Sequence, residues 1–201
     1  TLLHLGDFHA RPDARNVDRY RVLDDVITYG LSLPELGAWL WPGDLNHSRM
    51  SITDRNALAE RLQRMATRAP VIIVYGNHDL PDDLDVFARL RSAHPIYVID
   101  QPTCLRIRLA TMRFATVFCL PYPTKAGLAV AGVPVGEVGA QASAALEAII
   151  MQAAGELAAA RAAGDLTWMI GHINVGGAIV STGQPNIGHE IELSPVHLAR
   201  L

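Results

Sequence analysis

Short apolar runs alternate with stretches of helical period along the first half of the chain. The runs at 1–5, 38–41 and 71–75 each stop at polar residues, which indicates buried strands. Apolar residues recur at helical spacing over 18–33 and 53–67. This alternation of strands and helices predicts a parallel sheet covered by helices.

The pattern changes after residue 80. A short helix over 84–91 precedes a strand at 96–99, and the runs 103–109 and 113–120 predict an antiparallel pair. The predicted sheet is therefore mixed. Pro, Gly and small residues over 121–134 predict a surface loop.

The last third returns to a helix and a strand. An alanine-rich helix is expected over 138–163 and an apolar strand over 166–170. A Gly-rich loop to Gly183, a strand near 189–193 and a helix start at Ser194-Pro195 follow. We expect one α/β domain over 1–201.

Composition places few limits on function. Half of the 201 residues are hydrophobic, which allows one sizeable core. The net charge of −3 gives no overall basic character, and the seventeen basic residues include one lysine, Lys125. Arginine would therefore meet an anionic partner. The densest group is Arg11, Arg15, Arg19 and Arg21, for which a solvated helix face is the alternative.

Cysteine content and hydropathy suggest a reduced, non-membrane setting. Cys104 and Cys119 form neither a disulfide framework nor a Cys-x-x-Cys metal pair, and we expect both to be reduced and buried. No apolar run reaches the roughly 18 residues of a membrane span, and the first residues do not have the basic-then-apolar pattern of a leader. Thr1 is not an initiator methionine, so residues before it, a leader included, stay open. A cytoplasmic protein without membrane association is predicted.

Four predicted strands each end in a polar, metal-competent group. Because the carboxyl ends of parallel strands share one edge of a sheet, these groups should converge. Three of the four would be interpreted as ordinary loops if they stood alone. The group at 76–79 is a more specific sign of a functional site, because a four-residue match is rare and it follows a fully apolar strand. The groups are Asp7-Phe8-His9, Gly43-Asp44, Gly76-Asn77-His78-Asp79 and Gly171-His172.

The donor types predict a metal centre. Carboxylate, imidazole and amide ligands without cysteine suit manganese, iron or zinc. Strand alternation would place Asp7 and His9 on the same side, within reach of one ion. The chain has neither a Gly-x-Ser-x-Gly elbow nor a Walker loop, which argues against a serine hydrolase and a nucleotide-triphosphate motor.

The four groups, in this order, resemble the successive motifs of the calcineurin-like metallophosphoesterases. That resemblance spans the chain and implies a four-layer α/β fold, a β-sandwich of two mixed sheets flanked by helices. Within the superfamily, three segments resemble the SbcD-type DNA repair nucleases. They are GDLNHSRMS at 43–51, IYVID at 96–100 and LPYP at 120–123.

The resemblance also implies ligand roles. Asp7 and His9 would hold the first metal, Asp44 would bridge, and Asn77 and His172 would hold the second. Two divalent ions roughly 3.5–4 Å apart would acidify a bridging water. Manganese is the expected metal, with iron, zinc or magnesium as alternatives.

Three further residues are implied to be catalytic. His78 would lie over the phosphate and stabilise charge or protonate the leaving oxygen, and Asp79 would orient the His78 imidazole. His47 would lie near the scissile group. Asn46 stands where the family has an apolar or aromatic residue, so a plain surface histidine is the alternative for His47.

One family motif is missing. The pattern ends in Gly-His-x-His, and the nearest match, Gly188-His189-Glu190-Ile191, lacks the second histidine. We therefore expect the C-terminal part of the domain to be missing beyond Leu201, and His189 to be an ordinary strand residue.

These observations favour a metal-dependent phosphodiester hydrolase, a DNA exonuclease or endonuclease of SbcD type. An SbcC-type ATPase partner and a homodimer are implied by the resemblance. A small-molecule phosphodiesterase or phosphatase stays open, as does a catalytically silent binding subunit with the phosphoesterase fold. The acidic charge and scarce lysine argue against DNA, because DNA binding depends on phosphate neutralisation.

Overall fold

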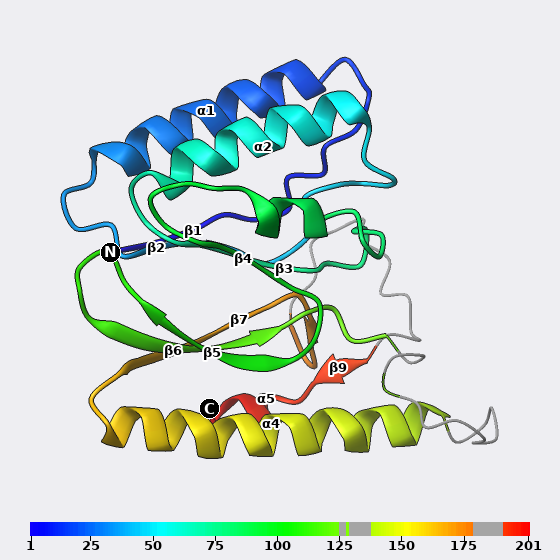
Figure 1. The fold of residues 1–201 in the computed structure, drawn as a ribbon. Helices are drawn as coiled ribbons and strands as arrows, with labels where there is room; N and C mark the ends of the chain where they lie inside the picture. Colours follow the sequence, from blue (N-terminus) through cyan, green and yellow to red (C-terminus); the bar gives the residue numbers. More distant parts are fainter. Residues whose placement is uncertain (125–127, 129–137, 179–190) are drawn as a thin grey trace.

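Four layers make up the fold (Figure 1). Helices α1 and α2 cover one face of a four-stranded sheet, a three-stranded sheet packs on the other face, and α4 covers the far side of the second sheet. The predicted α/β sandwich flanked by helices is confirmed. The computed structural model describes residues 1–124, 128, 138–178 and 191–201.

The first sheet is parallel throughout, in the order β1-β2-β3-β4. Its inner strands are buried on both faces, as their continuous apolar runs predict. By contrast, β1 is largely exposed, because β2 is its only strand neighbour among the described residues. The strands are β1 (Leu2–His4), β2 (Ala38–Trp41), β3 (Val71–Val74) and β4 (Ile96–Ile99).

The second sheet has the order β5-β6-β7 and is mixed. β5 (Thr103–Arg108) and β6 (Phe114–Leu120) form the predicted antiparallel pair, and β7 (Leu166–Gly171) runs parallel to β6. The antiparallel pair therefore starts a new sheet and does not extend the first. β8 (Asn174–Val175) and β9 (Glu192–Leu193) form a small separate ladder.

The helices begin and end within two residues of the predicted bounds. Ser51 caps α2, because its Oγ accepts a hydrogen bond of 3.0 Å from the Asp54 N–H. The short helix predicted over 84–91 is a 3₁₀ helix at Asp85–Arg89. The helices are α1 (Asn16–Ser32), α2 (Ile52–Ala66), η1 (Asp85–Arg89), α4 (Val138–Ala162) and α5 (Pro195–Leu198).

Apolar side chains of the described residues form three cores, one at each interface between adjacent layers. Trp39 and Trp41 of β2 face the helices α1 and α2, whereas Ala38 and Leu40 face the second sheet. This alternation follows from the period of two along a strand. The third core lies between the second sheet and α4 and contains Ile150.

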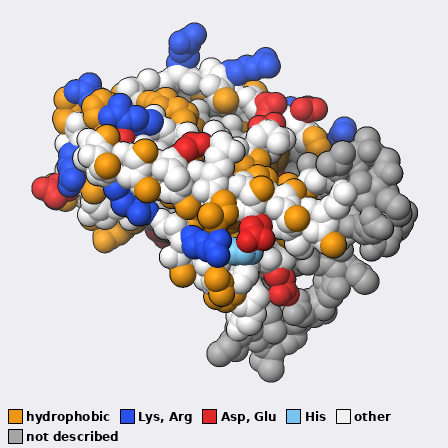
Figure 2. All heavy atoms as spheres, turned by 90° about the horizontal axis from the view of Figure 1, so that it is seen from below, with side chains coloured by type: hydrophobic (Ala, Val, Ile, Leu, Met, Phe, Trp, Pro, Cys, Tyr) orange, Lys and Arg blue, Asp and Glu red, His pale blue; other side chains and the backbone are white. Residues whose placement is uncertain are grey.

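The outer face of α4 carries apolar side chains interspersed with charged ones (Figure 2). No helix within the described residues is both long and apolar enough to cross a membrane. Both cysteines are free. Cys119 is buried and Cys104 half-buried, and burial raises the pKa of each thiol to about 12.

Some predictions concern residues outside the described ranges. Most of the predicted loop 121–134, residues 179–183 of the Gly-rich loop and the predicted strand residue His189 belong to this group. The start of the Gly-rich loop is described and contains β8, which the sequence did not predict. The helix start at Ser194-Pro195 is confirmed, because Ser194 caps α5 and Pro195 is its first residue.

Candidate metal centre

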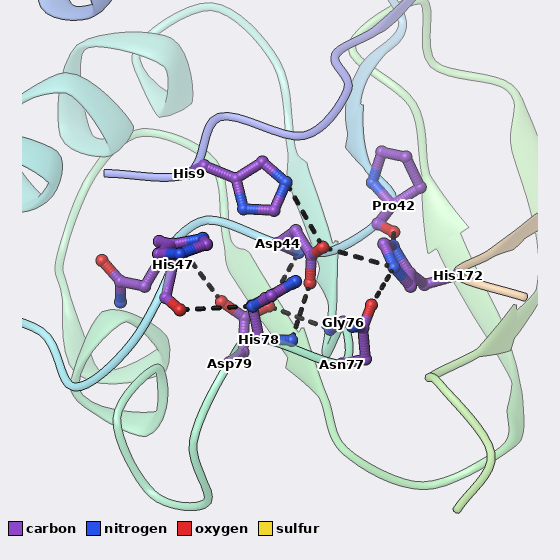
Figure 3. A network of polar contacts seen from close by, with 10 residues as sticks. His9, Pro42, Asp44, His47, Gly76, Asn77, His78, Asp79 and His172 are labelled. Atoms are coloured by element: carbon purple, nitrogen blue, oxygen red, sulfur yellow. Dashed lines mark hydrogen bonds and ion pairs between the residues drawn. The ribbon is translucent and has the colours of Figure 1, made fainter. Parts of the chain in front are cut away.

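Polar side chains from both sheets meet at the carboxyl ends of their strands (Figure 3). Asp7 and His9 follow β1, Asp44 follows β2, Asn77 follows β3, and His172 follows β7. The convergence predicted from the sequence is observed. Since β7 belongs to the second sheet, the centre spans the junction between the two sheets.

Asp44 occupies the middle of the centre. Its Oδ2 lies 3.5 Å from Nε2 of His9 and 3.5 Å from Nε2 of His172, and its Oδ1 accepts a 3.0 Å hydrogen bond from the His78 backbone N–H. The side chain is 4% exposed. One buried carboxylate thus lies between imidazoles that come from different sheets, as a bridging ligand would.

Two glycines allow the strand ends to approach. A Cβ on Gly43, whose φ is +106°, would lie 2.7 Å from Nδ1 of His172 and 2.8 Å from Cα of Gly76. A Cβ on Gly76 would lie 2.1 Å from Oδ1 of Asp44. Asp44 and His9 adopt φ of 53° and 50°, a left-handed conformation that is uncommon outside glycine. Strained backbone of this kind is typical of functional sites.

The contacts of His172 fix which ring nitrogen can bind a cation. Its Nδ1 lies 2.8 Å from the Pro42 carbonyl oxygen, which only accepts hydrogen bonds, so Nδ1 carries the proton. In the neutral ring Nε2 is then an acceptor, and it lies 2.8 Å from Oδ1 of Asn77 and 3.5 Å from Oδ2 of Asp44. These three atoms are all hydrogen-bond acceptors with no donor among them, and such a set fits a divalent cation. The backbone partner of Nδ1 is the support usual for a metal-bound histidine.

Among the described residues, two groups of side chains could each hold a metal ion, and the ligand atoms within each group lie within 4.8 Å of one another. Asp7, Asp44 and His172 form the first group, and His9 forms the second with two other histidines, His47 and His78. The sequence had paired Asp7 with His9. That pairing assumed alternation along a strand, whereas β1 ends at residue 4 and His9 is left-handed, so alternation does not apply here. His9 lies beside Asp44, and the Asp7 charge acts on its pKa, so a shared ion for Asp7 and His9 stays a prediction.

The second group consists of three imidazoles. The His47 and His78 rings stack with centroids 4.8 Å apart, and the His9 ring meets that of His78 edge-on at 5.0 Å. His47 is therefore an exposed residue that nonetheless contacts the centre. Burial lowers the pKa of His9, and His78 and His47 lower it further while Asp44 opposes them. A neutral imidazole is the form that binds metals.

Asp79 has a different role from the predicted one. Its Oδ2 accepts 2.9 Å hydrogen bonds from the backbone N–H groups of Asp44 and Gly76, and its Oδ1 accepts a 3.0 Å bond from that of Asn46. Burial raises the Asp79 pKa, and the Gly76 and Asn46 amide bonds oppose that shift. Asp79 thus ties the loop after β2 to the loop after β3.

Among the described contacts, Asp79 does not accept the predicted hydrogen bond from the His78 ring, and its two oxygens accept from backbone amides instead. Nδ1 of His78 instead lies 3.2 Å from the His47 carbonyl oxygen. Sequence reasoning also missed two neighbours of His172. The Pro42 carbonyl left no signal, because backbone atoms are common to every residue, whereas Tyr122, whose ring centroid lies 5.9 Å from that of His172, stands in the LPYP segment.

Comparison with known families gives one match. A family model described as calcineurin-like phosphoesterase matches residues 1–124. The matched range includes the groups that follow β1, β2 and β3 and ends before His172. No curated protein matches the chain.

Proposed function

The chain belongs to the calcineurin-like phosphoesterase family, and on this premise we propose that it is a two-metal phosphodiester hydrolase acting on DNA. Metal-dependent hydrolysis of a phosphoester is the chemistry that the family implies. The pair of ions, manganese as the metal and DNA as the substrate are the parts that we propose.

The position of Asp44 carries the proposal. A buried carboxylate with an imidazole 3.5 Å away on either side can serve two cations at once. Asp7 and His9 would complete one position, and Asn77 and His172 the other. Two divalent cations, when bound, lower the pKa of water and stabilise charge on the phosphate during an in-line displacement.

His78 would act on the leaving group. Its backbone N–H holds Asp44, while its half-buried ring lies against the rings of His9 and His47. An imidazole beside a metal centre can donate a proton to the departing oxygen, as a general acid. In this scheme Asp79 positions the loops and does not touch the substrate.

DNA is proposed on the segments at 43–51, 96–100 and 120–123, which resemble SbcD-type nucleases. The same resemblance supports an SbcC-type ATPase partner and a homodimer as parts of the proposal. A cytoplasmic location is proposed on the cysteine content and the absence of a long apolar run.

The test compares DNA with a small chromogen. Purified protein with manganese should degrade linear duplex or single-stranded DNA and also hydrolyse bis-p-nitrophenyl phosphate. Hydrolysis of the chromogen with intact DNA would point to a small-molecule phosphodiesterase and overturn the DNA assignment. No hydrolysis of either, with no bound metal by elemental analysis, would indicate a binding subunit.

His78→Ala tests the assigned roles within the site. We expect the rate of chromogen hydrolysis to fall by roughly 10²–10⁴-fold, which is the usual contribution of a general acid. Metal content should stay unchanged, because His78 is assigned to proton transfer and not to metal binding. His94→Ala, at a histidine before β4, is the matched control. Loss of metal in His78→Ala would make His78 a ligand.

A further inference from the structure

A cavity of about 690 Å³ adjoins the metal centre, between the exit of β1 and the first half of α1. Asp7 lines this cavity and also belongs to the group with Asp44 and His172. A molecule that fills the cavity therefore reaches the metal centre. Its volume is within the range of small-molecule sites.

The walls of the cavity are largely apolar. They include Leu5, Phe8, Val22 and Val26, together with Trp41 of β2. The Phe8 and Trp41 rings meet edge-on with centroids 5.9 Å apart, which fixes both side chains. Inorganic phosphate gains nothing from such walls, whereas a substrate with a flat, weakly polar group buries apolar area there.

Trp41 also has a hydrogen-bond donor without an acceptor. The residue is 1% exposed, and its Nε1 is buried with no partner among the described residues. Trp39, two residues earlier on the same strand, donates from Nε1 to the Met65 carbonyl at 3.0 Å. Buried indole N–H groups usually have an acceptor. Trp41 lines the cavity, but its Nε1 atom is covered, so its ring contributes apolar surface to a ligand there and not a hydrogen bond.

The charged residues that line the cavity are Asp7, Asp18, Arg15 and Arg19, and Asp18 pairs with Arg21. Arg19 binds Asp13 through two hydrogen bonds of 2.7 and 3.1 Å, and Arg11 pairs with the same carboxylate. The guanidinium of Arg15 makes no ion pair or hydrogen bond within the part of the chain that the structure describes, and Arg15 is exposed. Arg15 is therefore available to a phosphate group.

We propose that this cavity binds the nucleoside of a substrate whose phosphate lies at the metal centre, which rests on the function proposed above. A nucleobase is flat, weakly polar and packs on aromatic rings, so it matches the apolar walls of the cavity and the Phe8 ring among them. The attached phosphate matches Arg15 and the cations. The same nucleotide unit can be the end of a DNA strand or a free nucleotide.

Calorimetry with dAMP and inorganic phosphate, in the presence of manganese, tests the proposal. The wild-type protein should bind dAMP about tenfold or more tightly than phosphate. Val22→Trp places a large ring at the mouth of the cavity, on a residue that is 55% exposed and so tolerates size. It should weaken dAMP binding by about tenfold and phosphate binding by less than about twofold.

Two further variants separate a specific effect from misfolding. Val17→Trp, on the same helix but 77% exposed and outside the cavity, should bind dAMP as the wild type does. Trp41→Phe removes only the covered N–H and keeps an aromatic ring in the wall, and should change dAMP binding by less than about twofold. Equal affinity for dAMP and phosphate in the wild type would overturn the nucleoside site, even if the chromogen is hydrolysed.

Competition distinguishes the two sources of the nucleotide. A linear oligodeoxynucleotide that displaces dAMP, when a circular single strand does not, identifies a DNA end as the occupant. Displacement by neither identifies a free nucleotide, and both results support the site. A circular strand that displaces dAMP as well as the linear one would contradict a pocket for a terminal nucleotide. Failure of the proposed function would show separately, as a lack of hydrolysis.

Discussion

Single residues of the centre are held in conformations that ordinary side chains avoid. Gly43 has a φ of +106°, and its α-carbon faces the His172 ring and the Gly76 backbone with no room for a methyl group. The non-glycine residues Asp44 and His9 are also left-handed. Such backbone costs about 1–3 kcal/mol per residue and persists only where surrounding contacts enforce it.

Gly43→Ala should therefore damage both stability and the site. The new Cβ would displace His172 from Asp44, and we expect the free energy of unfolding to fall by about 1–3 kcal/mol with loss of hydrolysis. Urea unfolding measures the change. Gly155→Ala is the control, because nothing lies within 4 Å of its Cβ in the interior of α4, and it should gain up to about 1 kcal/mol. A Gly43→Ala protein as stable and active as the wild type would contradict the geometry.

At this scale the sequence predicted which residues meet but not how they pair. The groups after four strands converge as expected, because parallel strands end at one edge. The predicted hydrogen bond between the His78 ring and Asp79 was wrong, since it depends on backbone angles beyond the strands, whereas the assignment of Asp7 and His9 to one ion stays a prediction. A motif specifies residue types and spacing, whereas the direction of a side chain in a loop follows from contacts with distant segments.

Among the elements, β7 has an anchor that joins all three strands of its sheet. Asp165, directly before β7, accepts hydrogen bonds of 2.7 and 3.0 Å from the Arg106 guanidinium of β5 and one of 3.0 Å from the Thr116 hydroxyl of β6. The bonds from Arg106, followed by the Thr116 bond, hold the pKa of Asp165 below its ordinary value.

This anchor should make stability depend on pH. A carboxylate whose folded pKa is lowered stabilises the fold fully above its unfolded pKa, near 3.9, and that contribution is lost as the pH falls through the folded pKa. Asp165→Asn should therefore lower the melting temperature at pH 7, and the difference from the wild type should shrink below about pH 4. Thermal unfolding between pH 7 and 2.5 measures it.

Asp25→Asn is the matched control for this series. Asp25 is exposed on α1, and its side chain makes no ion pair or hydrogen bond among the described residues. Its melting temperature should follow that of the wild type at every pH. A gap between Asp165→Asn and the wild type that stays constant down to pH 2.5 would contradict the role of the Asp165 charge.

Element types and bounds followed well from periodicity. Predicted and observed limits of α1, α2 and α4 differ by at most two residues, because amphipathic period and capping residues are local signals. The exposure of β1 was not predictable, since an apolar run has the same appearance at the edge of a sheet and at its centre. Division of the strands into two sheets also depends on long-range pairing, which no local pattern reports.

On the scale of the whole molecule, cations at the centre would connect the two sheets. His172 comes from β7, whereas the other expected ligands follow β1, β2 and β3. A ligand that binds only the folded state at 100 times its dissociation constant stabilises it by about 2.7 kcal/mol. For a protein of this size, that corresponds to a rise in melting temperature of roughly 5–10 °C.

Manganese added to protein that was first treated with a chelator should produce this rise. Asp44→Asn should abolish most of it, because one carboxylate is shared between the two expected positions, whereas His78→Ala should retain it. Differential scanning calorimetry provides the measurement. A full shift in Asp44→Asn would show that manganese stabilises the fold from another location.

The junction between the sheets has one more consequence. The core that contains Val74 and Val117 fixes how far the second sheet can slide over the first, and the separation between His172 and Asp44 changes with any such sliding. An ångström of misplacement can reduce a rate by about a hundredfold. Side chains buried far from any reacting atom therefore determine how His172 and Asp44 are aligned. Substitutions in the core between the two sheets are expected to change the reaction rate.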